Sequence, residues 1–121
     1  PQAGLEDPGA YRREYGTKLV LNGFAGACNF QYQRGSWNDF VDPNGRLNMM
    51  AYPTMTKPVP TRQWEGWRTA VDDVRYLSLM KNRGLFSMEW LKQECGNDPG
   101  LCRKKMVKKI LSPNPPSQGR P

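Results

Sequence analysis

The sequence predicts a mainly α-helical protein with extensive irregular structure, in which an extended N-terminal half carries short hairpins and a C-terminal segment forms three helices. Three observations support this fold class. The 121 residues include only six Val, one Ile and five Thr, which are too few β-branched side chains for a large sheet. The 12 Gly and 11 Pro place much of the chain outside regular elements. Helical periodicity and capping signals are concentrated in the second half.

Three parts are expected along the chain. Residues 1–60 form an extended arm with a short N-terminal helix and hairpins, residues 61–111 form the three-helix segment, and residues 112–121 form a Pro-rich tail. In the arm, Asp7 is suited to cap a helix and Pro8 to occupy its first position. A helix of one or two turns is therefore predicted there.

The rest of the arm is predicted to be extended. Residues 18–21 (KLVL) lead into an Asn-Gly pair at 22–23, which is typical of tight hairpin turns. Apolar and polar residues then alternate over 28–33, which predicts a strand with one buried face. Residues 42–45 (DPNG) predict a second hairpin turn.

Residues 48–60 are predicted to form an extended connector whose backbone hydrogen bonds are largely unmade. They hold three Pro and three Met without a helical or strand period. Flexible linkers are usually polar, so an apolar connector is expected to lie in a groove of this protein or of a partner. The side chains predicted to contact a partner protein are Trp37, Met49, Met50, Tyr52 and Met55.

Capping residues and periodicity define the three C-terminal helices. The first begins after Thr61 and ends near Gly84, the second begins after Ser87, and the third begins after Asp98. An apolar stripe on the first helix is expected to face the core, with two tryptophans as its anchors. The stripe consists of Trp64, Trp67, Val71, Val74, Leu77 and Met80.

Two cysteines flank the turn between the second and third helices. Folding this hairpin would bring Cys95 and Cys102 together, and a disulfide there would stabilise the fold by about 2.5 kcal/mol. The alternative is that all three cysteines, Cys28 included, are reduced and buried. A zinc site is less favoured because the chain has no His, and a redox pair because the CxxC spacing is absent.

Positive charge is concentrated at the C-terminus. The net charge is +7, and residues 99–121 hold six basic and no acidic side chains. On the third helix, four lysines lie opposite an apolar side that also includes Arg103. Such a face is either solvated or binds a polyanion such as an anionic lipid surface or rRNA. The predicted polyanion-binding residues are Lys104, Lys105, Lys108 and Lys109.

Catalytic chemistry has little support in the sequence. There is no His for acid–base catalysis, and no Cys or Ser has a recognisable base beside it. Asp72 and Asp73 are consecutive in a helix, so their side chains diverge by about 100°. We expect no enzyme activity, no metal site, no small-molecule substrate and no transmembrane segment, and no cofactor can be assigned.

The expected function is that of a non-catalytic accessory subunit. Because the arm buries little apolar surface of its own, we expect a linker or supernumerary subunit that stabilises a large respiratory or photosynthetic complex through protein contacts. It would lie in a mitochondrion or plastid, peripheral to a membrane complex. The alternative is an organellar ribosomal protein that contacts rRNA through its basic C-terminal helix. A third possibility is a small secreted or redox-active domain joined by the two cysteines.

Overall fold

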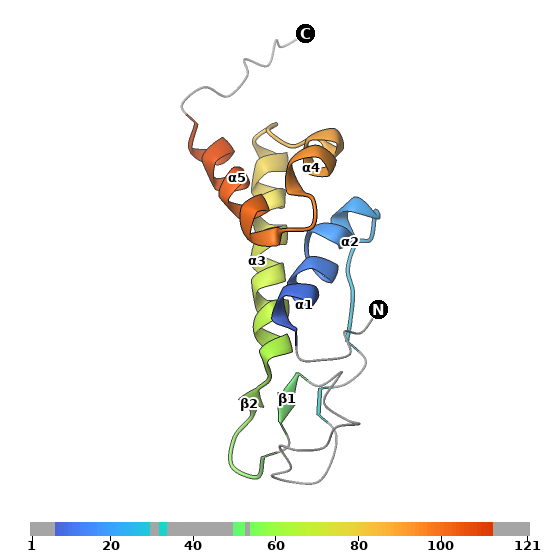
Figure 1. Cartoon of the computed structure of the whole chain (residues 1–121), viewed down its shortest axis with the longest axis vertical. Helices are drawn as coiled ribbons and strands as arrows, with labels where there is room; N and C mark the ends of the chain where they lie inside the picture. Colours follow the sequence, from blue (N-terminus) through green and yellow to red (C-terminus); the bar gives the residue numbers. More distant parts are fainter. Residues whose placement is uncertain (1–6, 30–31, 34–49, 53, 113–121) are drawn as a thin grey trace.

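The computed structural model describes residues 7–29, 32–33, 50–52 and 54–112, and it confirms the mainly helical fold class. Helix α3 runs along the long axis of the molecule (Figure 1). Helices α1 and α2 lie along one side of it, α4 and α5 pack near its C-terminal end, and a short hairpin lies at its N-terminal end. The elements are α1 (Pro8–Glu14), α2 (Thr17–Leu21), β1 (Ala51–Tyr52), β2 (Val59–Pro60), α3 (Arg62–Asn82), α4 (Met88–Cys95) and α5 (Pro99–Leu111).

Helices α1, α3, α4 and α5 each begin at a residue whose side chain caps the helix. Each N-cap side chain accepts a hydrogen bond from a backbone N–H in the first turn of its helix, which satisfies a donor that has no partner inside the helix. Helix α4 then ends at Gly96, whose φ of 44° suits glycine. The capping side chains are Asp7, Thr61, Ser87 and Asp98, all as predicted.

Helix α2 corrects the prediction of a strand at residues 18–21. Its N-cap is Gly16, which offers no side-chain hydrogen bond, so the local sequence gives no signal for a helix start. Val20 and Leu21 pack against the main core, and this tertiary contact explains the helix. The Asn-Gly pair ends α2 instead of forming a hairpin, with Gly23 at a φ of 74°.

The predicted strand at 28–33 is also wrong for the part that the structure describes. Residues 24–29 and 32–33 contain no strand, and the side chains of Cys28 and Tyr32 are exposed. Alternation alone therefore did not indicate a buried face. The predicted turn at 42–45 lies outside the described residues.

The predicted connector at 48–60 forms a hairpin over its described part. Strand β1 pairs antiparallel with β2 in a register that sets Ala51 opposite Pro60. The backbone N–H of Ala51 also donates to the carbonyl of Tyr32, at 3.0 Å. The prediction of largely unmade backbone hydrogen bonds is thus wrong here, because partners come from both sides of β1.

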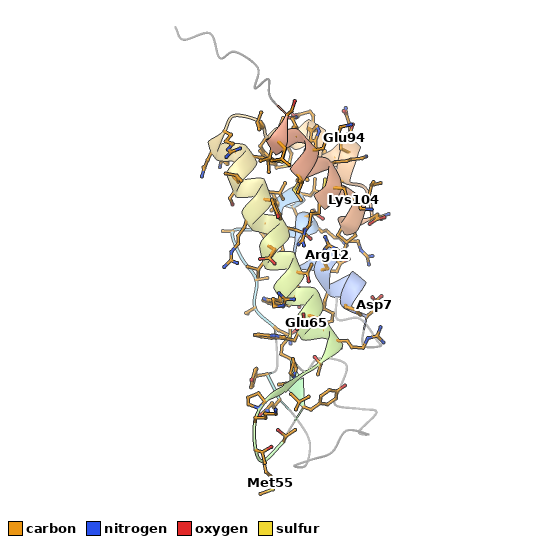
Figure 2. All side chains as sticks on the ribbon, turned by 90° about the vertical axis from the view of Figure 1, so that its left-hand side faces the viewer. Asp7, Arg12, Met55, Glu65, Glu94 and Lys104 are labelled. Atoms are coloured by element: carbon orange, nitrogen blue, oxygen red, sulfur yellow. A yellow bond between two sulfur atoms is a disulfide. The ribbon has the colours of Figure 1, made fainter. Side chains whose placement is uncertain are left out.

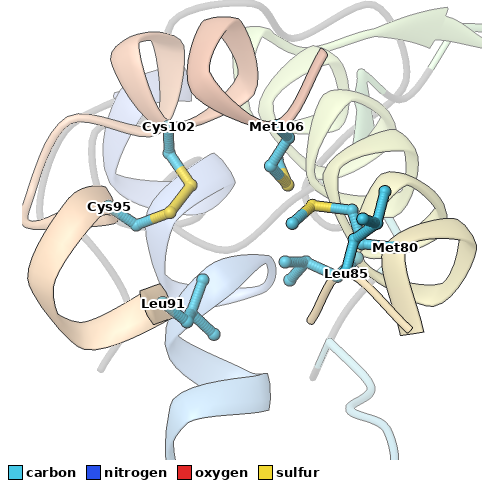
Figure 3. Close-up of a cluster of buried hydrophobic side chains, with 7 residues drawn as sticks. Met80, Leu85, Leu91, Cys95, Cys102 and Met106 are labelled. Atoms are coloured by element: carbon cyan, nitrogen blue, oxygen red, sulfur yellow. A yellow bond between two sulfur atoms is a disulfide. The ribbon is translucent and has the colours of Figure 1, made fainter. Parts of the chain in front are cut away.

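The main apolar core lies between the C-terminal end of α3, α4 and α5 (Figure 3). Side chains from these three helices and from the α3–α4 loop point toward one another, and Val20 and Leu21 of α2 pack against them. Burial of this kind is the dominant favourable term in folding. The buried members are Leu77, Met80, Leu85, Leu91, Cys95, Cys102 and Met106.

The inner face of α3 differs from the predicted stripe in its N-terminal half. Leu77 and Met80 are buried as expected, whereas Trp64 and Val71 are each 38% exposed. The buried face is rotated by about one residue, or about 100°, from the predicted one over this half. Its members are Gln63, Gly66, Ala70, Asp73, Leu77 and Met80.

A close approach of two helices explains this rotation. A Cβ atom at Gly66 would lie 2.8 Å from the Cα of Pro8 and would also overlap the carbonyl oxygen of Pro8. The start of α1 therefore touches the backbone of α3, which only glycine permits. The short helix of the predicted arm is thus packed on the three-helix segment and is not separate from it.

A buried ion cluster ties α1, α3 and α5 together. Asp73 is fully buried, and its carboxylate accepts hydrogen bonds from Arg12 Nε at 2.6 Å and from Arg103 Nε at 2.6 Å. Figure 2 shows Arg12 between the helices. Arg12 Nη2 also donates to the carbonyl of Pro99, and Arg103 Nη2 to that of Thr69. We name Arg12, Asp73 and Arg103 the Asp73 cluster.

None of the helices in the described part of the chain combines the length and apolar character needed to cross a lipid bilayer.

Replacing Gly66 by Ala should destabilise the fold. Alanine in an exposed helix would add about 1 kcal/mol of stability relative to glycine, but here the methyl group would push α1 away at a cost of about 1–3 kcal/mol. We expect a net loss in the free energy of unfolding, measured by urea denaturation. Gly26→Ala, which meets no atom within 4 Å, is the matched control and should change it little. A stabilised Gly66→Ala variant would contradict the close approach.

Replacing Asp73 by Ala should cost about 3 kcal/mol, because it leaves two partly buried arginines without their counter-ion. The control is Asp72→Ala, since Asp72 is the adjacent residue but forms an exposed pair with Arg75. Exposed pairs of this kind contribute under about 1 kcal/mol. Equal losses for the two variants in the same denaturation measurement would show that Asp73 does not organise the fold.

Candidate functional site

The residues predicted to contact a partner are not all available for that role. Met50 is only 5% exposed, so its side chain belongs to the protein's own interior, contrary to the prediction. Tyr52 is half-buried, and Met55 is 73% exposed in the β1–β2 loop, at the end of the molecule opposite Glu94 (Figure 2). Partner contact through these two residues stays a prediction. Trp37 and Met49 lie outside the described residues.

The four predicted lysines lie on α5, where Lys104 and Lys108 are exposed and Lys105 and Lys109 are half-buried. Lys105 Nζ lies 3.0 Å from the Glu94 carboxylate and donates to the Glu94 carbonyl at 2.8 Å. Lys109 Nζ lies 4.9 Å from the ring centroid of Trp90 on α4, which is within the range of a cation–π contact. Two of the lysines thus help to hold α4 against α5. Polyanion binding stays a prediction, which rests mainly on the other two.

The cysteines form the predicted disulfide. Cys95 at the end of α4 and Cys102 in the first turn of α5 are joined, with their Cα atoms 4.4 Å apart, and both side chains are buried. Cys28 is free and exposed. Within the described ranges, no three His, Cys, Asp or Glu side chains converge as metal ligands would. The disulfide is structural in position, because it lies inside the main core (Figure 3).

An apolar groove runs between α3 and the segment that contains α2 and the following loop. It has a volume of about 230 Å³. Its α3 wall includes Trp67, Val71 and Val74, which were predicted to face the core, together with Arg75 and Ser78. We name it the apolar groove and define it by Tyr15, Leu19, Phe24, Trp67, Val71 and Val74.

Two aromatic rings in contact, Tyr15 and Trp67, line the groove, and Tyr15 also stacks on the buried Tyr11. The ring centroids of Tyr15 and Trp67 are 4.2 Å apart, and those of Tyr11 and Tyr15 are 5.3 Å apart. Burial raises the pKa of the Tyr15 hydroxyl, and the nearby Cys28 and Glu14 raise it further. Tyr15 therefore remains a neutral phenol near pH 7, so it adds no charge to the groove.

The apolar surface continues along α3 beyond the groove. A second cavity of about 300 Å³ shares Trp67 with it and is also lined by Trp64, Tyr32 and Cys28. At the groove's edge, Phe24 is 62% exposed. The charged group on the lining is Arg75, which pairs with Asp72 at 3.2 Å. This face is therefore mainly aromatic and aliphatic.

Comparison of the chain with protein-family models, curated proteins and solved structures found no match.

Removing the disulfide by Cys95→Ala together with Cys102→Ala should lower the free energy of unfolding by about 2.5 kcal/mol, because the unfolded chain regains the entropy of an open eight-residue loop. Urea denaturation measures the loss. Cys28→Ala, at an exposed free thiol, is the control and should have little effect. Thiol labelling of the unfolded, unreduced protein should modify one cysteine, and three labels would show that the pair is reduced.

Proposed function

We propose that the protein is a non-catalytic accessory subunit that binds another protein through the apolar groove. The observation that carries this proposal is the outward position of large apolar side chains on α3 and on the loop facing it. Val71 is 38% exposed and Phe24 is 62% exposed, and both line the same concave surface. Contiguous exposed apolar surface of this kind commonly marks an interaction site.

The size of the groove favours side chains of a partner over a bound cofactor. Pockets for drug-sized molecules typically measure roughly 300–1,000 Å³ and hold several converging polar groups. The groove measures about 230 Å³, and its polar lining groups include Arg75, already paired, and Ser78, whose hydroxyl donates to the carbonyl of Val74. Insertion of one or two apolar side chains from a partner fits this lining better.

The composition of the lining also favours a protein partner. Tyr, Trp, Phe and Arg are enriched in protein interfaces, and Lys is depleted. Tyr15, Phe24, Trp67 and Arg75 line the groove, whereas the exposed lysines of α5 lie elsewhere. Aromatic anchors in well-packed pockets dominate binding energy in such interfaces. Phe24 and Trp67 are therefore the expected anchors.

The parent assembly stays a prediction from the sequence. We propose a large respiratory or photosynthetic complex of a mitochondrion or plastid, to which this chain would add protein contacts at the periphery. Fractionation of source cells, followed by sedimentation of native extracts, would place the chain in such a complex or exclude it.

Val71→Glu should remove the chain from its assembly, because it replaces an apolar contact by a carboxylate that must lose its water when a partner's apolar side chains cover the groove. We expect a drop of about tenfold or more in the fraction that co-sediments with high-molecular-weight material in native extracts. A photo-crosslinking amino acid at position 24 should form a covalent product with one defined protein.

The control is Leu79→Glu. Leu79 lies on the same helix and is 37% exposed, against 38% for Val71, but it does not line the groove. It should leave co-sedimentation unchanged, and a crosslinker at position 79 should not give the same product. Normal incorporation of Val71→Glu, or a wild-type chain that sediments alone, would refute binding through the groove.

A further inference from the structure

The end of the molecule formed by α4, α5 and the last turn of α3 carries most of the net charge. Residues 81–112 include eight basic and three acidic side chains, so they hold +5 of the total charge of +7. They gather at one end of the long axis (Figure 1). Among the described residues, positive charge is therefore concentrated at this end, away from the β1–β2 hairpin.

The solvent-facing side of α5 combines lysines with leucines. At 3.6 residues per turn, the side chains from Leu101 to Leu111 that make up this side fall within an arc of about 120° around the helix axis. Leu101 is 47% exposed and Leu111 is 74% exposed, and they are about 15 Å apart along the helix, with the lysines between them. We name this surface the α5 outer face, and it consists of Leu101, Lys104, Lys105, Lys108 and Leu111.

Lys104 and Lys108 are available cations on this face. Among the residues that the structure describes, no carboxylate lies within ion-pair distance of either, whereas Lys105 is held by Glu94 at 3.0 Å. The long aliphatic stem of a lysine can lie along apolar material while its ammonium reaches a polar layer. Contact with an anionic partner would therefore break no ion pair made by Lys104 or Lys108.

The inner side of α5 fixes this face in place. Cys102 and Met106 are fully buried, the disulfide joins α5 to α4, and Arg103 binds Asp73 on α3. An isolated helix of 13 residues would be marginal in water, so it would lose ordering entropy on binding. Here the fold has already ordered the helix, which makes its outer face a rigid docking surface.

We propose that the α5 outer face binds the surface of an anionic lipid bilayer. Lys104 and Lys108 would lie among the anionic headgroups, and Leu101 and Leu111 would enter the boundary with the acyl chains. The leucines favour lipid over nucleic acid. A phosphate backbone would pair with the lysines but leave both leucines in water, whereas a bilayer interface accommodates both kinds of side chain.

Vesicle sedimentation with the full, oxidised chain tests this proposal. The wild type should bind vesicles of phosphatidylcholine with 30% phosphatidylserine, bind phosphatidylcholine alone much more weakly, and lose binding as salt rises. Lys104→Gln with Lys108→Gln should weaken binding about tenfold or more, since each lysine near an anionic surface contributes roughly fivefold. Leu101→Ser with Leu111→Ser should weaken it about threefold or more.

The matched control is Lys57→Gln with Arg62→Gln, which removes the same charge from two exposed residues near the opposite end. This control should keep most of the binding, as should Val71→Glu, whose groove is a separate surface. Equal losses in control and lysine variants would show a response to net charge alone and would overturn the proposal. So would failure of the wild type to bind, or binding to RNA that depends on the lysines and ignores the leucines.

Discussion

The buried carboxylate of Asp73 is the interaction on which the packing of this protein depends. It accepts hydrogen bonds from arginines that lie 61 residues before it and 30 residues after it, so it fixes α1 and α5 on one side of α3. A buried carboxylate without partners would be very costly, and with two arginines it is satisfied. Such a cluster contributes modest net stability, and in this structure it lies on the side of α3 that faces α1 and α5.

The exposed apolar groove follows from that choice. Because Gly66, Ala70 and Asp73 occupy the inner side of α3 in its N-terminal half, larger side chains on the same turns are displaced outward. Trp67 and Val71 are then only partly covered, by Tyr15 and the loop after α2. The close contact with α1 and the surface proposed to bind a partner thus have one cause. If Trp64 and Trp67 faced inward instead, α1 could not pack on α3 and the Arg12–Asp73 ion pair would be lost.

Local signals in the sequence predicted the helix ends well, because a cap needs only a side chain and the backbone two or three residues away. They failed for α2, whose stability comes from Val20 and Leu21 in the main core. They also gave the wrong phase for the first half of α3, since apolarity ranked tryptophan above glycine and aspartate as a core residue. Two features of the sequence pointed to the buried ion pair: Arg103 lies on the apolar side of its helix, and Asp73 follows another aspartate, Asp72, on α3. Read as a pair, they would have indicated a buried ion contact, but not its third member, Arg12.

The two proposed surfaces lie on different sides of α3 and depend on different forces. The groove uses Trp67, Val71 and Val74, whereas α5 packs against the side that carries Thr69 and Asp73, roughly 140° away around the helix. Binding in the groove depends on burial of apolar surface and resists salt, while binding through α5 depends on charge and weakens with salt. A protein in the groove would therefore not block a bilayer at α5. Under the two proposals, the same small fold would hold a partner next to a membrane surface, with the disulfide and the Asp73 cluster linking the two contacts.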